Sequence, residues 1–191
     1  MPLSITPECS GSQTVGPYYA IGLDHLVSET LAGPYSEGKH VTITGTVFDA
    51  DDEPVPDAIL ELWQASPSGQ YKEQQELGSA RDLNGYLGFA RLSTHRGGTF
   101  KVDTVSPGPT LFPDGRQQAP HIVVLVFMRG LMLHLVTRIY LPDEPLNDHD
   151  PVLQLVPEAR RSTLIATHNG PQRLRWDIHL QGPQETVFFK C

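Results

Sequence analysis

The sequence has little cysteine and a deficit of positive charge. Its two cysteines, Cys9 and Cys191, lie near opposite ends of the 191 residues, which indicates neither a disulfide framework nor a zinc motif. The 14 Lys and Arg residues are outnumbered by 22 Asp and Glu, and the formal net charge is -8. Nucleic acid and anionic membranes need a clustered cationic surface. We therefore expect no nucleic-acid partner and no membrane partner.

Long apolar runs are also absent from the sequence. A membrane-spanning helix needs roughly 20 consecutive apolar residues, and no segment approaches that length. The first residues lack both the basic start and the apolar stretch of a secretory signal. We expect a soluble, cytoplasmic protein.

Proline and glycine, by contrast, are plentiful, with 17 of each spread along the chain. Such punctuation is typical of many short strands joined by turns, so we predict an all-β sandwich with few short helices. Alternating residues at 41–47, the turn "DADDEPVP" and a strand at 58–63 predict a hairpin-like pair. Further strands are predicted at Thr99–Val105, His121–Phe127, Leu131–Leu141, Leu174–Gln181 and Thr186–Phe189, and short helices at Asp24–Ala32 and Glu158–Ala166.

Residues 1–40 do not follow the alternating pattern and form a predicted N-terminal arm, followed by the sandwich domain at 41–191. The arm carries "SQTVGPYYAIG", in which Gly16 and Pro17 predict a turn. The apolar area of Tyr18, Tyr19 and Ile21 is costly to leave in water. From physics alone, the arm folds on its own sandwich or on another subunit, and the sequence favours neither.

Several motifs lie in an order that resembles the intradiol ring-cleaving dioxygenases. They include "GTVFDADDEPVPDAILELWQASPSGQY", "TVSPGPT", "QAPHIVV" and "TRIYLPDEPLNDHDPVL". With the arm motif "SQTVGPYYAIGL" and the terminal "WDIHLQGPQETVFF", the chain is similar to the alpha chains of two-chain members of the family that act on protocatechuate. The resemblance implies an intradiol dioxygenase-like β-sandwich.

The family holds a ferric ion with two tyrosinates and two histidines, and the resemblance identifies where these ligands would fall. The His-x-His strand motif reads His121-Ile122-Val123 here, and the tyrosine after Pro-Gly-Pro is Thr110. The other tyrosine falls near Gly78 or Ser79, and the family's arginine is replaced by Gln118. Valine has no donor atom and threonine is a poor substitute for a phenolate. We predict no metal ligands and no catalytic residues in this chain, with His121 as a vestigial structural histidine.

Tyr71, Tyr86, His95 and His134 could serve as substitute metal donors, but nothing in their spacing argues for such a site.

In alpha chains of the family, a Thr-x-Gly-Pro turn closes over the iron pocket of the beta subunit. The resemblance therefore implies substrate-binding roles for Thr14, Gly16 and Pro17, flanked by Tyr18, and for Arg129 in "VFMRGL". A positive side chain is suited to the carboxylate of protocatechuate. The alternative for Arg129-Gly130 is a solvated hairpin turn, and for Gly16-Pro17 a simple turn.

The resemblance implies a supporting subunit of a non-haem Fe(III) enzyme that cleaves protocatechuate with O2 to 3-carboxy-cis,cis-muconate. The iron is expected in the beta subunit, within a larger alpha-beta oligomer. Two alternatives stay open. One is a self-sufficient intradiol dioxygenase for another catechol, and the other is a non-catalytic transthyretin-like binding sandwich.

Overall fold

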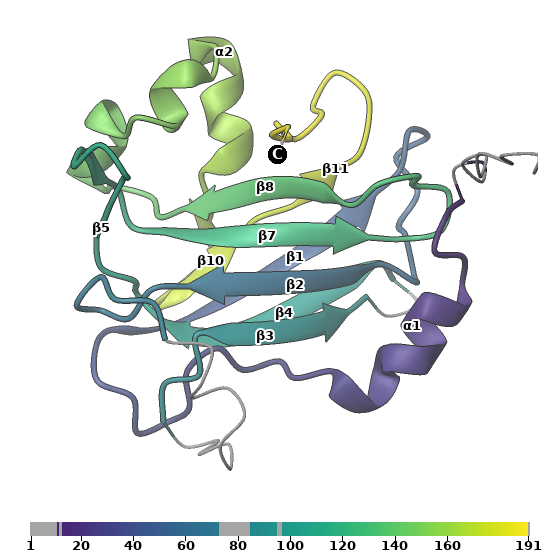
Figure 1. The fold of residues 1–191 in the computed structure, drawn as a ribbon, viewed down its shortest axis with the longest axis horizontal. Helices are drawn as coiled ribbons and strands as arrows, with labels where there is room; N and C mark the ends of the chain where they lie inside the picture. Colours follow the sequence, from purple (N-terminus) through teal and green to yellow (C-terminus); the bar gives the residue numbers. More distant parts are fainter. Residues whose placement is uncertain (1–10, 12, 73–84, 95–96, 191) are drawn as a thin grey trace, which may run out of the picture.

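Two β-sheets packed face to face form the body of the molecule (Figure 1). The computed structural model describes residues 11, 13–72, 85–94 and 97–190. Within them, the first sheet contains β1 (His40–Phe48), β4 (Thr99–Val105), β9 (Thr167–His168), β10 (Arg173–Arg175) and β11 (Ile178–His179). The second contains β2 (Ile59–Gln64), β3 (Phe89–Ser93), β7 (His121–Phe127) and β8 (Leu135–Tyr140). The predicted all-β sandwich is confirmed.

The remaining elements are short. A small ribbon pairs β5 (Thr110–Leu111) with β6 (Gln117–Gln118). The helices are α1 (Tyr18–Leu23), α2 (Glu158–Arg161) and the 3-10 turns η1 (Asp24–Leu26), η3 (Pro145–His149), η4 (Leu153–Leu155) and η5 (Ser162–Leu164). Among the described residues, no helix has the length and apolar character needed to cross a membrane.

Period-two alternation places the core between the sheets. In β7, Ile122, Val124 and Val126 are fully buried and belong to the main apolar cluster, together with Ile43 and Val47 of β1. Because successive strand residues point to opposite faces, the odd-numbered residues of β7 lie on the outer face of the second sheet. His121 and Phe127, which mark the two ends of the site described below, lie on this outer face.

The predicted hairpin between residues 41–47 and 58–63 is wrong, because β1 and β2 belong to different sheets. The turn itself forms, with the Asp49 amide donating to the Glu53 carbonyl at 3.0 Å. Pro54 and Pro56 follow and have no N–H to donate to a ladder with β1. The chain then crosses to the second sheet, while β1 pairs with β4, β10 and β11.

Helix predictions are met at one place and displaced at the other. α2 and η5 together span residues 158–164, inside the predicted helix at 158–166. The helix predicted at 24–32 instead occupies residues 18–26. Leu31 explains the displacement, because it is fully buried in the main core and its amide donates to the Asp103 carbonyl at 2.9 Å.

Strand predictions for the second half of the chain hold for β4 and β7, whose bounds match. The strand predicted at 131–141 begins only at Leu135, since a turn occupies 129–133. The strand predicted at 174–181 is split into β10 and β11 around the buried Trp176. The strand predicted at 186–189 is wrong, since this segment forms only an isolated bridge, between Phe189 and Val136.

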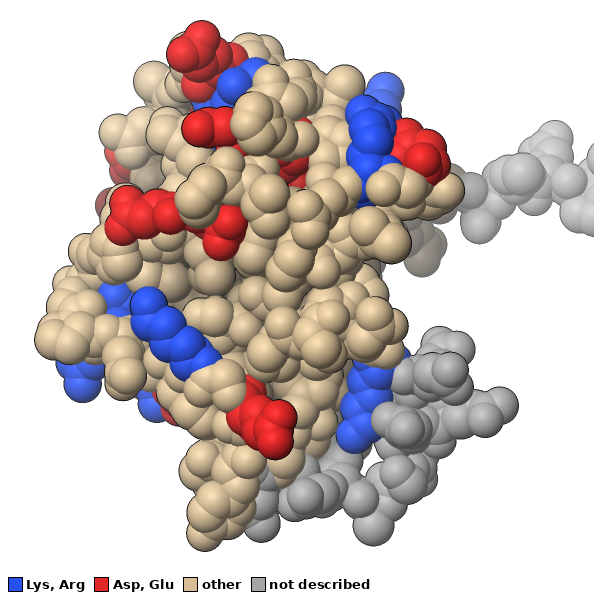
Figure 2. All heavy atoms as spheres, turned by 90° about the vertical axis from the view of Figure 1, so that its left-hand side faces the viewer, with Lys and Arg blue, Asp and Glu red and all other residues tan. Residues whose placement is uncertain are grey.

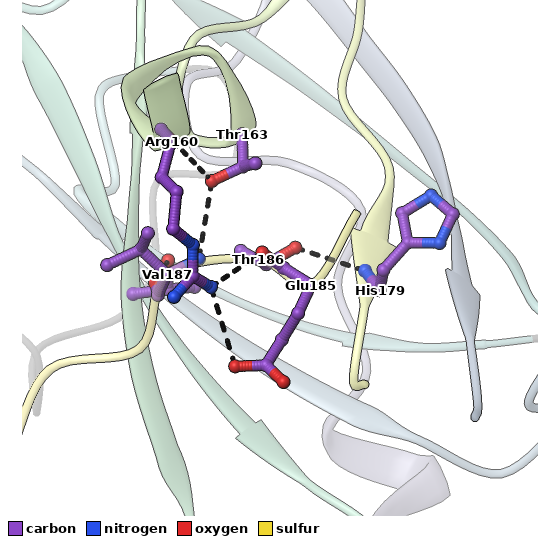
Figure 3. Close-up of polar contacts among 7 residues, drawn as sticks. Arg160, Thr163, His179, Glu185, Thr186 and Val187 are labelled. Carbon is purple, nitrogen blue, oxygen red and sulfur yellow. Dashed lines mark hydrogen bonds and ion pairs between the residues drawn. The ribbon is translucent and has the colours of Figure 1, made fainter. Parts of the chain in front are cut away.

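The C-terminal segment is held by side-chain contacts and not by a continuous strand ladder (Figure 3). Arg160 of α2 donates to the Glu185 carbonyl oxygen at 3.0 Å, and Thr163 Oγ1 accepts from the Val187 amide at 3.3 Å. Thr186 is buried, and its hydroxyl accepts from the backbone amide of His179 in β11. The motif "GPQETVFF" thus closes the sandwich against α2 and β11.

Candidate functional site

The outer face of β7 joins two regions that the sequence singled out. His121 lies at the start of the strand and Phe127 at its end, with Arg129 two residues beyond. In Figure 1 the start of β7 lies at the left, and α1 with the arm lies at the right, beside the β7–β8 turn. We describe the two ends in turn as the His121 pocket and the arm cluster.

In the His121 pocket, the histidine is buried and both ring nitrogens are engaged. Nδ1 donates to the Ala119 carbonyl at 2.7 Å, which leaves Nε2 as the acceptor facing the Tyr71 hydroxyl at 3.5 Å. Burial lowers the pKa of His121 to about 4, and the positive charge of Arg138 acts in the same direction. The imidazole is therefore neutral at physiological pH.

The residues at the family's tyrosine and arginine positions are bonded to each other. Gln118 Nε2 donates to Thr110 Oγ1 at 3.1 Å, and both side chains are buried. Arg138 of β8 donates through Nη1 to Gln118 Oε1 at 3.0 Å. A hydrogen-bond network of Thr110, Gln118 and Arg138 thus occupies two of the positions that the family resemblance assigns to iron chemistry.

Asp150 anchors the base of this network and is fully buried. Its carboxylate accepts from the Tyr140 hydroxyl at 2.9 Å and from the Ala119 amide at 2.8 Å. It also caps η4, accepting from the amides of Val152 and Leu153 at 2.9 and 2.7 Å. Such a carboxylate is stabilised because nearly all of its lone pairs are satisfied.

Two glycines bring the "SPSGQY" and "PGPT" motifs together beside this pocket. A Cβ at Gly108 would lie 2.2 Å from the Pro67 carbonyl oxygen, and one at Gly69 would lie 2.1 Å from that of Pro109. Gly69 also has φ +79°, a region that favours glycine. Only glycine permits this close backbone approach, which sets Tyr71 and Thr110 around His121.

The donor set of the His121 pocket does not fit a ferric site of the family's kind. Val123 lies on the same face as His121 but has no donor atom, and Gly78 and Ser79 fall outside the described residues. Among the residues that the structure describes, no group of three or more His, Cys, Asp or Glu side chains is arranged to hold a metal ion. We therefore derive no reaction step through a metal in this chain.

Three of the four substitute donors lie in the described part of the chain. Burial raises the pKa of the Tyr71 phenol and that of the Tyr86 phenol, and the Tyr86 hydroxyl donates to the Gln64 carbonyl. His134 stacks on Phe127 at the other end of β7, 5.3 Å between ring centroids. His95 lies outside the described residues.

At the arm cluster, defined as Thr14, Gly16, Pro17, Tyr18 and Arg129, the structure brings the arm against the β7–β8 turn. Thr14 Oγ1 accepts from the Gly130 amide at 2.8 Å, a contact between residues 116 positions apart. It also accepts from the Gly16 amide at 3.4 Å, and Gly16 adopts φ +64° before Pro17, the N-cap residue of α1. The arm residues and Arg129, separated in sequence, therefore occupy one location.

Exposure distinguishes this location from the core. Tyr18 is 80% exposed, whereas its neighbour Tyr19 stacks on Phe127 at 5.3 Å. Val15, Phe127 and the β7–β8 turn line an apolar cavity of about 190 Å³. Met132 and Leu133 of the same turn are 61% and 79% exposed. Apolar side chains thus gather here without cover from the described part of the chain.

Arg129 supplies the positive charge of the arm cluster. Its Nε lies 3.0 Å from Asp57 Oδ2, and its side chain remains 59% exposed. Asp57, two residues before β2, was not singled out from the sequence, and neither were Arg138 and Asp150. All three lie within the quoted family motifs, which are the only signal that could have indicated them.

Figure 2 shows the end of the sandwich at which β7 begins. On the described part of this face, Lys and Arg side chains are interspersed with Asp and Glu. Neither sign of charge forms a continuous patch there, as a polyanion-binding surface would require.

Comparisons with known proteins agree with this geometry. A family model described as "Dioxygenase" matches residues 15–182. The chain belongs to this family, the intradiol ring-cleavage dioxygenases.

Within the family, the chain is 42% identical to "Protocatechuate 3,4-dioxygenase alpha chain" of Burkholderia cepacia, covering 93% of this chain and 95% of that one. It is 31% identical to the beta chain of the same species' enzyme, covering 82% of this chain and 66% of that one. The solved dioxygenase domain of a carbohydrate-binding fusion protein from Streptomyces sp. SirexAA-E superposes with a TM-score of 0.60 at 24% identity, covering 84% of this chain and 89% of that one. This last likeness supports the fold.

Proposed function

We propose that the chain is the alpha subunit of a protocatechuate 3,4-dioxygenase. The assembled enzyme cleaves protocatechuate between its two hydroxylated carbons with O2 and yields 3-carboxy-cis,cis-muconate. The main support is a difference in side-chain burial and hydrogen bonding between the two ends of β7. The His121 pocket is filled by a closed polar network, whereas the arm cluster is assembled and exposed.

Distance separates the two ends within this chain. A strand rises about 3.3 Å per residue, so the six steps from His121 to Phe127 amount to roughly 20 Å. A substrate of one aromatic ring does not span that length. If the arm cluster contacts substrate, the metal ligands of that site belong to another chain.

The proposed partner is a beta subunit that holds Fe(III), in alpha-beta protomers gathered into a larger oligomer. The likeness to both an alpha chain and a beta chain supports this division. The exposed apolar residues at the arm and the β7–β8 turn supply area for such an interface. In the proposed arm of residues 1–40, the part that precedes Leu31 packs on the partner, because Leu31 itself belongs to this chain's own core.

This chain's share of catalysis is positioning. In this proposal Arg129 receives the substrate carboxylate, since a guanidinium can bind a carboxylate through two parallel hydrogen bonds. The turn at Thr14, Gly16 and Pro17, with Tyr18, would close the pocket and exclude water, which strengthens such charged contacts. The chemistry of oxygen activation belongs to the metal of the partner.

Metal content and activity test the proposal directly. Purified alone, the chain is expected to carry no stoichiometric iron and to show no protocatechuate-dependent oxygen uptake. Co-expressed with a beta chain, it is expected to give a complex with ferric-tyrosinate absorbance and oxygen uptake. Stoichiometric iron with uptake by the lone chain would mean a self-sufficient dioxygenase, and failure to form any complex would leave a separate binding module.

Arg129→Gln in the assembled enzyme tests the carboxylate role. Losing a charge-assisted hydrogen bond costs about 1.5–3 kcal/mol, so we expect the KM for protocatechuate to rise about tenfold or more. Catechol, which lacks the carboxylate, should show little change in KM. Equal effects on both substrates would contradict the assignment of Arg129.

A further inference from the structure

The register of the second sheet places Asp57 opposite Arg129. β2 and β7 are antiparallel, and Ile59 pairs with Phe127 at the end of the ladder. Extending that register by two residues brings position 57 opposite position 129. The ion pair between Arg129 Nε and Asp57 Oδ2, at 3.0 Å, follows from this register.

Stability does not account for the pair. The Arg129 side chain is 59% exposed and the Asp57 side chain 20%, and exposed ion pairs contribute little to folding. Asp57 Oδ1 is buried and has no hydrogen-bond partner among the described residues. A carboxylate with one oxygen withdrawn from water carries a desolvation cost that a single exposed partner offsets poorly.

The geometry does account for an orienting role. The Asp57 carboxylate approaches the guanidinium at Nε, and no hydrogen bond to a residue in the described part of the chain engages the Nη groups at its far end. The next residue, Gly130, donates to Thr14 Oγ1, which holds the arm beside the same turn. A long arginine side chain loses rotamer freedom when it binds, and a fixed partner on one edge reduces that loss.

We infer that Asp57 is a positioning residue, which holds the Arg129 guanidinium at the arm cluster so that its free edge receives a carboxylate. This inference rests on the proposed function, in which the carboxylate belongs to the substrate. Asp57 touches no reacting atom, and its contribution passes entirely through Arg129.

The experiment compares variants in the assembled enzyme, using protocatechuate and catechol as paired substrates. Asp57→Asn is expected to raise the KM for protocatechuate about threefold, with kcat at saturation and the KM for catechol unchanged. Asp57→Glu keeps the charge and should restore most of the difference. Asp51→Asn, in the exposed turn before β2, is the matched control and should behave as the unmodified enzyme.

A double variant separates the inference from the function on which it rests. In the Arg129→Gln background, Asp57→Asn should have no further effect on the KM for protocatechuate, because the group it orients is gone. If Arg129→Gln raises that KM and Asp57→Asn does not, the positioning role is wrong and the proposed function stands. If Arg129→Gln itself changes nothing, the carboxylate role fails first.

Two other outcomes also decide the question. Equal changes for protocatechuate and catechol in Asp57→Asn would assign Asp57 a structural role and overturn the inference. Should Asp57→Asn fail to assemble, Asp57→Ser replaces it in every comparison, with the same results expected.

Discussion

Polar side chains are arranged differently at the two ends of β7. At the His121 pocket, Thr110, Gln118 and Asp150 are buried, and Gln118 donates to Thr110. The partly buried Arg138 donates to Gln118 and to the Tyr140 hydroxyl, which donates to Asp150. At the arm cluster, Tyr18 and Arg129 are exposed and one oxygen of Asp57 lacks a partner in the described residues. The buried network stabilises the fold, whereas the exposed groups of the arm cluster are the ones that our proposal assigns to substrate and partner.

Asp150→Ala should produce the largest loss of stability. A small loss would contradict the distinction between the two ends of β7. The substitution leaves the Tyr140 hydroxyl and the amides of Ala119 and Leu153 without their acceptor in a buried place. Each buried group left unpaired costs about 1–3 kcal/mol, so we expect a loss of about 3–5 kcal/mol in the free energy of unfolding. Urea denaturation measures it.

Asp148→Ala is the control for this prediction. Asp148 is exposed and lies in the same 3-10 turn region, so its removal should change the free energy of unfolding by less than about 0.5 kcal/mol. Similar losses for the two variants would show that the buried network contributes nothing particular to stability.

His121 gives the second largest effect, seen as a pH dependence. Its pKa falls from 6.5 to about 4 in the folded state, so below pH 6.5 the unfolded chain binds the proton and the folded chain does not. Stability is therefore fully present above pH 6.5 and falls as the pH drops toward 4. At pH 5 the loss due to this residue is about 2 kcal/mol.

His121→Gln should flatten the pH profile of stability between pH 6.5 and 4.5, measured by urea denaturation at each pH. His25→Gln, at an exposed position, should retain the slope of the unmodified protein. An unchanged slope in His121→Gln would mean that the imidazole is protonated as easily in the folded state as in the unfolded one, contrary to its burial.

Thr14→Val should give the smallest effect on stability, and it tests whether the Thr14 hydroxyl holds the arm. The variant loses the acceptor for the Gly130 amide, at an exposed contact, so the free energy of unfolding should change by less than about 1 kcal/mol. Limited proteolysis should nevertheless cleave the arm faster, because the link to the β7–β8 turn is gone.

Thr14→Ser retains the hydroxyl and should keep the proteolysis rate of the unmodified chain. Equal rates for the Val and Ser variants would mean that the Thr14 hydroxyl does not hold the arm.

Much of the fold was predictable from local pattern, whereas strand pairing was not. Alternation located β4 and β7 with correct bounds because side-chain period decides which face of a strand is buried. Alternation says nothing about which strand lies alongside. The hairpin of residues 41–63 was therefore wrong, although its turn and both of its strands were correct.

For the candidate site, the sequence identified each group separately. The family motifs indicated Thr14, Gly16, Pro17, Tyr18, Arg129 and His121, and the missing ligands at Val123 and Thr110. Asp57 was not found, since its partner lies far along the chain and only the β2–β7 register brings them together. The substrate-binding roles of the five arm-cluster residues remain predictions.

The all-β class, the family and the replacement of family ligand types at Thr110 and Val123 follow from residue types and their order. The contacts between Gln118 and Thr110, between Thr14 and Gly130, and between Asp57 and Arg129 become visible only in the folded chain. The physical reason is that these contacts depend on sheet pairing and crossover, which no local pattern of side chains encodes.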